Sequence, residues 1–299
     1  MVISKPEVYK IDKNFLGIEE KYSSYEKSNI VIIPVPFEAT TSYGKGTALG
    51  PEAILNASHY VEFFDEETKK EVCFEKGICT LQKLMFKNLS LEKAFQKIYE
   101  VVLKEIRNKK FVVTLGGEHS VSNPIIKAHF DYFKKFSVLH FDAHSDLRQE
   151  YEGSKFSHAS FAARVYEFNP DIVQVGIRAQ CKEEAEFIRK NRIKTFYAYE
   201  IKQGKYGKNW QEKILEVLKE DIYITFDVDF LDPSIMPSTG TPEPGGFLWD
   251  ETLKMLKMLG ERKNVIGFDV VELSPKRDLP FADFLTAKLI YKMLNYFIK

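Results

Sequence analysis

The chain has 299 residues, of which 44% are hydrophobic and 29% are charged, so we expect a well-packed globular body. Its 43 basic and 43 acidic side chains cancel, which gives no electrostatic reason to expect a nucleic-acid partner or an anionic membrane surface. No apolar run is long enough for a transmembrane helix or a secretion signal. The three cysteines lack paired spacing, and we expect a cytoplasmic protein.

Short β-branched runs alternate with amphipathic helical patterns along the chain. Strands are predicted at residues 30–37, 111–117, 137–144, 171–178, 194–201, 221–230 and 264–273. Helices are predicted between them, among others at residues 91–108, 182–191, 210–220 and 249–259. This alternation predicts an α/β fold with a central, mostly parallel sheet that helices cover on both faces. No repeat or linker divides the sequence, so we expect one domain over residues 1–299.

Polar side chains follow several of these strands at their carboxyl ends, where open α/β sheets bind their ligands. They are Glu118 and His119, then Asp142, His144 and Asp146, then Asp227 and Asp229, and finally Glu272. Because the carboxyl ends of parallel strands meet at one edge of a sheet, we expect these side chains to gather there.

The spacing of these acids and imidazoles predicts a metal centre. Strand side chains alternate faces, so Asp142 and His144 point the same way, as do Asp227 and Asp229, while Asp146 curls back from just beyond its strand. Buried together, the carboxylates would repel one another without cations. Two divalent ions sharing bridging carboxylates would use all six candidates and activate a water molecule between them. The predicted ligands are His119, Asp142, His144, Asp146, Asp227 and Asp229. Oxygen and imidazole donors favour Mn²⁺, with zinc and cobalt left open.

Purely structural interpretations also fit parts of this pattern. An acid at a strand end often caps the next helix, and that interpretation would prevail for either motif alone. Their joint occurrence favours metal. His140 is expected in the core, His59 and His129 in structural positions in helical stretches, Asp232 in a turn, and Asp269 as a buried hydrogen-bonding acid.

Taken together, the motifs resemble a known family. The segments "GGEHS", "HFDAHSD", "SHASF", "FDVDFLDPS", "TGTPEPGG" and "VVELSP", in this order, are similar to those of the ureohydrolases, which include arginases and agmatinases. The resemblance covers about residues 34–273 and includes "GKGTALGPEAI". It implies an arginase-like three-layer α/β/α fold and two Mn²⁺ ions per subunit. It also implies hydrolysis of a guanidinium group to release urea through a metal-bridging hydroxide, and a homo-oligomer, either a trimer or a hexamer.

The resemblance also implies roles for individual residues. His119 and Asp146 would bind one ion, His144 and Asp229 the other, and Asp142 and Asp227 would bridge them, whereas Glu118 would not be a ligand. Asp146 also counts as catalytic, and His158 would shuttle protons. Glu272 would pair with the guanidinium, and Thr241 would lie beside it. Ala159 stands where the family usually has glycine. The chemistry agrees, because a departing amine needs a proton and a planar cation needs a carboxylate to orient it.

The segment "LRQEYEGSKFSHAS" resembles that of agmatinase-type members, and its Glu150 and Glu152 suit a substrate with a cationic far end. It favours conversion of agmatine to putrescine and urea. N1-aminopropylagmatine ureohydrolase, guanidinobutyrase, arginase and formimidoylglutamase remain alternatives, and the two glutamates alternatively lie on a solvated loop. Of other classes, a catalytically silent metal-binding relative would have lost site residues, and none is missing. A two-metal phosphoesterase would need basic groups beside the metals, where the sequence has acids.

Overall fold

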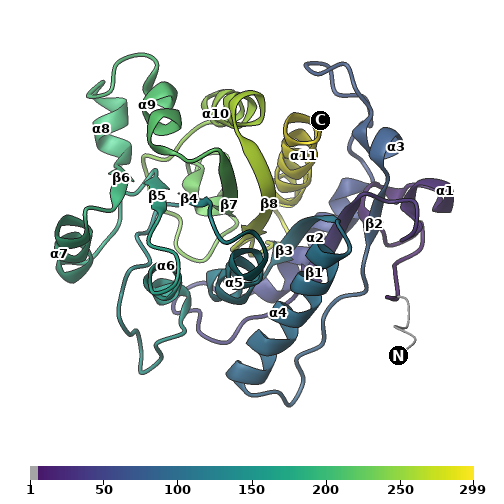
Figure 1. The fold of residues 1–299 in the computed structure, drawn as a ribbon, viewed down its shortest axis with the longest axis horizontal. Helices are drawn as coiled ribbons and strands as arrows, with labels where there is room; N and C mark the ends of the chain where they lie inside the picture. The colour runs from purple at the N-terminus through teal and green to yellow at the C-terminus, as the bar shows by residue number, and fades with distance from the viewer. Residues whose placement is uncertain (1–5) are drawn as a thin grey trace.

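The β-branched runs form the strands of one sheet in which every pairing is parallel. The computed structural model describes residues 6–299 and is shown in Figure 1. Its strands are β1 (Ile30–Val35), β2 (Ile78–Thr80), β3 (Phe111–Gly116), β4 (Ser137–Phe141), β5 (Ile172–Val175), β6 (Lys194–Phe196), β7 (Asp221–Asp227) and β8 (Asn264–Val271). Their order across the sheet is β2-β1-β3-β8-β7-β4-β5-β6.

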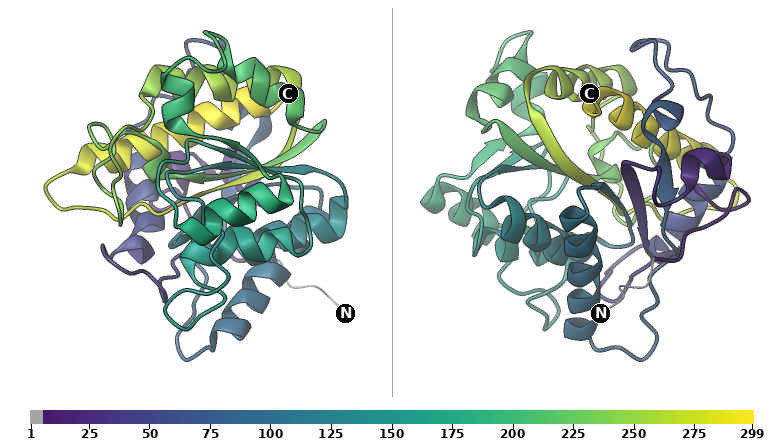
Figure 2. Two further views of the ribbon diagram at one scale, coloured as in Figure 1. Left: turned by 90° about the vertical axis from the view of Figure 1, so that its left-hand side faces the viewer. Right: turned by 45° about the vertical axis from the view of Figure 1, so that its right-hand side comes forward.

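Helices cover both faces of this sheet. They are α1 (Glu20–Ser23), α2 (Gly50–Ser58), α3 (Val72–Lys76), α4 (Leu91–Arg107), α5 (Ser122–Phe133), α6 (Phe161–Tyr166), α7 (Lys182–Asn191), α8 (Ala198–Lys202), α9 (Trp210–Val217), α10 (Trp249–Arg262) and α11 (Pro280–Phe297). Buried residues of α4 to α7 belong to one core cluster, and those of α2, α3 and α8 to α11 belong to the other. The left view of Figure 2 shows the sheet nearly edge-on between these helical layers. The three-layer α/β/α fold is thus confirmed.

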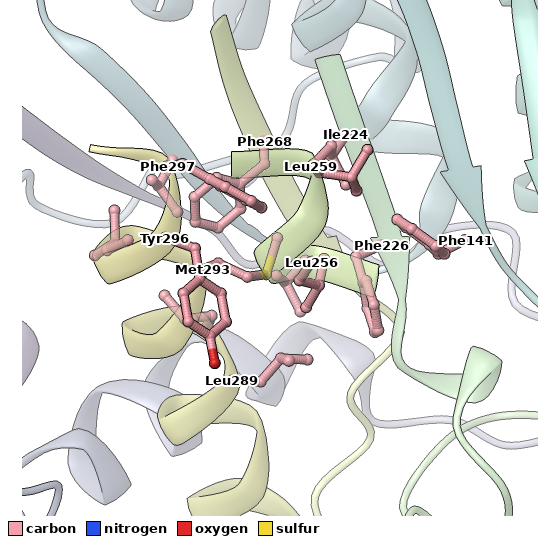
Figure 3. Packing of buried hydrophobic residues seen from close by; sticks show 14 of the residues in the cluster. Phe141, Ile224, Phe226, Leu256, Leu259, Phe268, Leu289, Met293, Tyr296 and Phe297 are labelled. Atoms are coloured by element: carbon pink, nitrogen blue, oxygen red, sulfur yellow. The ribbon is translucent and has the colours of Figure 1, made fainter. Parts of the chain in front are cut away.

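The strands are apolar on both sides because each side packs against a helical layer. Along β1, Ile30 and Ile32 belong to one cluster, whereas Val31 and Ile33 belong to the other. Figure 3 shows at close range the cluster to which α10 and α11 belong, where their side chains interlock with those of β7 and β8. Burial of this kind contributes roughly 25 cal/mol per Å² of apolar surface, so the two clusters hold the sheet rigidly as a platform for the site.

The structure differs from the predicted elements at several strands. The predicted strand at residues 194–201 is strand only to Phe196, after which the chain forms α8. The strand β2, at the sheet edge, was not predicted, because Ile78–Thr80 is too short to show a pattern. The predicted strands 137–144 and 221–230 end at Phe141 and Asp227, so that the alternation argument for Asp142, His144 and Asp229 does not hold.

Four neighbouring strands in the middle of the sheet, β3, β8, β7 and β4, end at the same edge. His119, Glu272 and Asp142 follow β3, β8 and β4, and Asp227 is the last residue of β7, so these side chains lie where open sheets bind their ligands. Among residues 6–299, the structure contains no helix of the length and apolarity that a bilayer crossing needs.

Candidate metal centre and substrate cavity

The imidazole of His119 lies at the centre of the first group of candidate ligands. His119 begins a short 3-10 helix (His119–Val121) directly after β3. Its Nδ1 atom lies 3.1 Å from Asp142 Oδ2, 3.4 Å from Asp146 Oδ2 and 3.2 Å from Asp227 Oδ2. The ring stacks on Phe161 at a centroid distance of 3.8 Å, which fixes its plane. Three carboxylates therefore converge on one nitrogen atom in a buried place.

The hydrogen bonds behind His119 show that Nδ1 is the nitrogen available to a cation. The hydroxyl of Thr225 donates to Asp269 Oδ1 at 2.7 Å, so its oxygen accepts from His119 Nε2, 2.9 Å away. In the neutral ring, this direction assigns the proton to Nε2 and leaves a lone pair on Nδ1. His119 Nδ1 is buried and has no hydrogen-bond partner. A buried nitrogen that faces carboxylates without a bond fits a metal ion, and the partner behind the ring is the usual second contact of a ligating histidine.

A second group of ligands shares Asp142 with the first. His144 Nδ1 lies 2.9 Å from Asp229 Oδ2 and 3.5 Å from Asp142 Oδ1. Because Asp142 turns Oδ2 toward His119 and Oδ1 toward His144, its carboxylate lies between the two groups. In the group of Asp142, His144 and Asp229, the ligand atoms all lie within 4.8 Å of one another. Asp227, whose Oδ2 faces His119, also accepts the backbone N–H of Asp229 on Oδ1 at 2.8 Å, so its carboxylate contacts residues of both groups.

The protonation equilibria of the carboxylates indicate how strongly this place attracts cations. Burial, and then the charge of Asp142, hold the pKa of Asp146 well above its usual range. Burial, followed by the charges of Asp229 and Asp142, does the same to the pKa of Asp227. Burial lowers the pKa of His119, but the hydrogen bond and charge of Asp142 and further acids reverse this and raise it to about 9. The cluster gains a proton or a metal ion readily, since either offsets the repulsion among its acids.

His140 contributes to the centre in a way that the sequence did not reveal. It is buried, as expected for a core residue, but its Nε2 lies 2.7 Å from Asp142 Oδ2. Its Nδ1 faces the amide nitrogen of Gln174 at 3.1 Å and accepts from it, so Nε2 donates to Asp142. His140 therefore orients the shared carboxylate. Its even spacing from Asp142 was the one signal for this role.

Three acids that were expected outside the ligand set accept hydrogen bonds from other groups of the chain. Glu118 is buried and accepts hydrogen bonds from the backbone N–H groups of Ala39 and Thr40, both at 2.7 Å. Asp269 is buried and accepts from Thr225, and it is confirmed as a hydrogen-bonding acid. Asp232 accepts from the backbone of Ser234, Gly245 and Gly246, which confirms its place in a turn.

A cavity of about 340 Å³ opens above these groups. Asp146, Asp227, Asp229 and His144 lie in its lining together with Glu272, the acid that follows β8. Glu272 accepts from the backbone N–H of His119 at 2.6 Å, and burial together with the charge of Glu118 raises its pKa to about 8. Asp146 and Glu272 have left-handed backbone, with φ of 51° and 66°. Strain of this kind concentrates at functional sites.

His158 and Thr241 reach the same cavity from two loops. His158 begins the short 3-10 helix His158–Ser160, and its ring meets that of Tyr151 edge-on at a centroid distance of 5.7 Å. Burial lowers the pKa of His158, and the charge of Glu118 acts against this. Thr241 Oγ1 lies 3.4 Å from His144 Nε2. Both predicted residues therefore lie beside the candidate metal centre.

Glu150 and Glu152 lie elsewhere than expected, because both are exposed and neither lines the cavity. The backbone of Tyr151 and Ser154 is paired in both directions, which turns Glu152 out at the tip of a tight turn. Glu243, two residues after Thr241, lies in the cavity instead, with Oε1 3.8 Å from His144 Nε2. Its main-chain carbonyl accepts from Arg178 at 2.9 Å. The acid in "TPEPGG" was the signal for this residue in the sequence.

Comparison with known proteins agrees with this geometry. The family model described as the arginase family matches residues 28–295. The N(1)-aminopropylagmatine ureohydrolase of Synechocystis is 38% identical over 95% of this chain and 94% of that protein. The agmatinase of Pyrococcus horikoshii is 32% identical over 90% and 92%. The crystal structure of the agmatine ureohydrolase of Thermoplasma volcanium superposes with a TM-score of 0.83 at 26% identity, covering 99% of this chain and 95% of that one. The fold, the gathered acids and imidazoles and these likenesses agree, and the chain belongs to the arginase family of ureohydrolases.

Proposed function

We propose that this enzyme hydrolyses the guanidinium group of a polyamine-type substrate, with N1-aminopropylagmatine as the preferred compound and agmatine as the second candidate. The observation that carries this proposal is the charge of the cavity. Beside the proposed metal ligands Asp146, Asp227 and Asp229, whose charges the bound ions would offset, its lining includes the acids Glu184, Glu243 and Glu272. Arg148 is the one lysine or arginine side chain in that lining among residues 6–299. Such a cavity attracts a cation along its length and repels a free carboxylate.

The names of the relatives support the order of the two candidates. The Synechocystis protein, at 38% identity, is named for N(1)-aminopropylagmatine, and the Pyrococcus protein, at 32%, is named an agmatinase. Both compounds end in ammonium groups, and the aminopropyl derivative carries one positive charge more. The agmatine substrate expected from the sequence is therefore kept, but as the second candidate.

The residues of the chain divide the proposed reaction between them. His119, Asp142, His144, Asp146, Asp227 and Asp229 would hold two Mn²⁺ ions, which when bound supply a nucleophilic water molecule at neutral pH. Glu272 would pair with the planar guanidinium and orient its carbon, since a carboxylate matches that fork of N–H donors. Thr241 would accept a hydrogen bond beside it. His158 would deliver a proton to the departing amine.

Glu243 would contact the far part of the substrate. Its carboxylate lies 3.8 Å from the distal nitrogen of His144, and its side chain is 38% exposed, so it stands between the buried acids and solvent. Glu272 and Glu243 line the same cavity, so a substrate held by Glu272 at one end would extend toward Glu243 at the other. The ion pair between Glu243 and the substrate would be partly exposed, so it would contribute little to binding, about 0–1 kcal/mol.

The proposal is tested by loading the protein with Mn²⁺ and measuring the urea that it releases from each of four compounds: N1-aminopropylagmatine, agmatine, 4-guanidinobutyrate and arginine. We expect kcat/KM to fall in that order, because the last two carry a carboxylate into an acidic cavity. A higher kcat/KM for arginine or 4-guanidinobutyrate than for agmatine would contradict the proposed substrate class. A higher value for agmatine than for its aminopropyl derivative would reverse the two candidates.

A further inference from the structure

One hydroxyl group links the proposed proton carrier to a distant loop. Thr40, in the loop that follows β1, places Oγ1 3.0 Å from the backbone nitrogen of His158, which donates to it. The same oxygen lies 3.5 Å from His158 Nδ1. The loop therefore contacts both the main chain and the ring of His158.

The partners of Thr40 determine which way its proton points. Glu118 receives two backbone N–H groups on Oε2 and two hydroxyls on Oε1, from Thr40 at 2.7 Å and from Ser120 at 2.6 Å. Glu118 is fully buried, and a carboxylate surrounded by four donors acts as acceptor only. The single proton of the Thr40 hydroxyl is therefore committed to Glu118.

This direction has a consequence for the imidazole of His158. Because Thr40 Oγ1 has given its proton to Glu118, it acts only as an acceptor toward His158, and its 3.5 Å contact with Nδ1 favours the neutral ring that carries its hydrogen there. The lone pair is then on Nε2, at the opposite edge of a ring that lines the cavity. A histidine held as one tautomer exchanges protons at one defined atom.

We propose that Thr40 is a positioning residue, which together with Glu118 holds His158 in the Nδ1–H tautomer so that Nε2 is the nitrogen that takes up and delivers protons in the cavity. The proposal rests on the proposed role of His158 in the reaction. It gives Glu118 a function that differs from metal binding, and it explains why a loop 118 residues away in the sequence meets His158 through a side-chain oxygen.

The kinetic test uses Thr40→Val, which keeps the shape and removes the hydroxyl, and Thr40→Ser, which retains it. For Thr40→Val we expect kcat to fall about 3- to 10-fold, the worth of one hydrogen bond, with KM and metal content unchanged. Thr40→Ser should restore most of the loss. In a His158→Asn background, Thr40→Val should cause no further loss, because both changes remove one function. If the loop needs the hydroxyl only for its own structure, Thr40→Val should lower activity by the same factor in the wild-type and His158→Asn backgrounds. That result would overturn the proposal.

A second readout does not depend on turnover. In protein labelled with ¹⁵N-histidine and loaded with diamagnetic Zn²⁺, long-range ¹H–¹⁵N correlations identify the tautomer of each of the six histidines. The signal of His158 is assigned by its absence in His158→Asn. We expect the Nδ1–H form in the wild type and a mixture or the Nε2–H form in Thr40→Val. An Nε2–H tautomer in the wild type would overturn the proposal even if the substrate were misassigned. A wild-type protein that shows the expected tautomer but releases no urea would contradict the proposed function and leave the tautomer assignment in place.

Discussion

The floor and the mouth of the cavity are built in different ways. The floor consists of residues at the carboxyl ends of four neighbouring parallel strands, and its acids Asp142, Asp227 and Asp229 are all nearly fully buried. The mouth is formed by loops, where the side chain of Glu243 is 38% exposed and Tyr43 is 82% exposed. The rigid sheet fixes the proposed metal ligands, whereas the loops are free to vary with the substrate. Changes at the floor should therefore abolish the reaction, and changes at the mouth should alter its selectivity.

The largest effect is expected for Asp142→Asn, which weakens the carboxylate shared by the two ligand groups. Activity should fall by roughly 10³-fold or more, because the ions that supply the nucleophile would lose their common ligand. Rates of urea release measured at saturating Mn²⁺ check this. Asp131→Asn, which changes a surface acid of α5 paired with Lys127, is the matched control and should leave the rate unchanged. A retained rate in Asp142→Asn would show that the floor does not act as a unit.

A smaller effect is expected for His158→Asn, because this residue moves protons and holds no metal in our account. Turnover should fall roughly 10²-fold, a typical contribution of general acid catalysis, while metal content stays the same. His59→Asn is the control, since that ring bonds the carbonyl of Asn14 and neither residue lines the cavity. Loss of metal together with turnover in His158→Asn would place the residue in the floor instead.

Glu272→Gln removes the carboxyl group that a bound guanidinium would hold in its ionised form, but keeps an oxygen for the backbone N–H of His119. A hydrogen bond to a charged group is worth about 1.5–3 kcal/mol, so kcat/KM should fall by roughly 10- to 150-fold for every guanidinium compound alike. Steady-state kinetics on agmatine and its aminopropyl derivative measure this. A loss confined to one of the two compounds would contradict the assignment of Glu272 to the guanidinium end.

The smallest effect is expected at the mouth. Glu243→Gln should raise KM by up to about 5-fold, and more for N1-aminopropylagmatine than for agmatine, because a partly exposed ion pair contributes little. Glu150→Gln is the matched control, since that acid is exposed and does not line the cavity. If the KM of each substrate is the same in the wild type and in Glu243→Gln, then Glu243 takes no part in substrate recognition. A KM increase in Glu150→Gln alone would return the role to the loop that the sequence indicated.

The floor was predictable because its signals are local. An apolar run that ends in alternating acids and imidazoles places them at the carboxyl end of a strand, and the parallel sheet then gathers four such ends. The argument from alternating faces nevertheless failed for Asp142 and Asp229, since their strands end at Phe141 and Asp227. The residues still converge, because short turns after the strands bring them back. The prediction was right in place and wrong in its local geometry.

The mouth was not predictable because it depends on how loops turn. Glu152 and Glu243 look alike in the sequence, but the Tyr151–Ser154 turn directs one to solvent, and Arg178 holds the main chain of the other at the cavity. The role of His140 depended on a contact with Gln174 from the neighbouring strand β5. Such contacts are set by tertiary packing, which no local pattern contains.

The stoichiometry of Mn²⁺ binding tests the central claim most directly, because the whole floor is interpreted as two sites that share Asp142. The metal-free protein is dialysed against buffered Mn²⁺, and bound metal is measured by elemental analysis. We predict two ions per chain in the wild type and fewer than two in Asp142→Asn. Saturation at one ion per chain or fewer in a fully active wild-type enzyme would contradict the account.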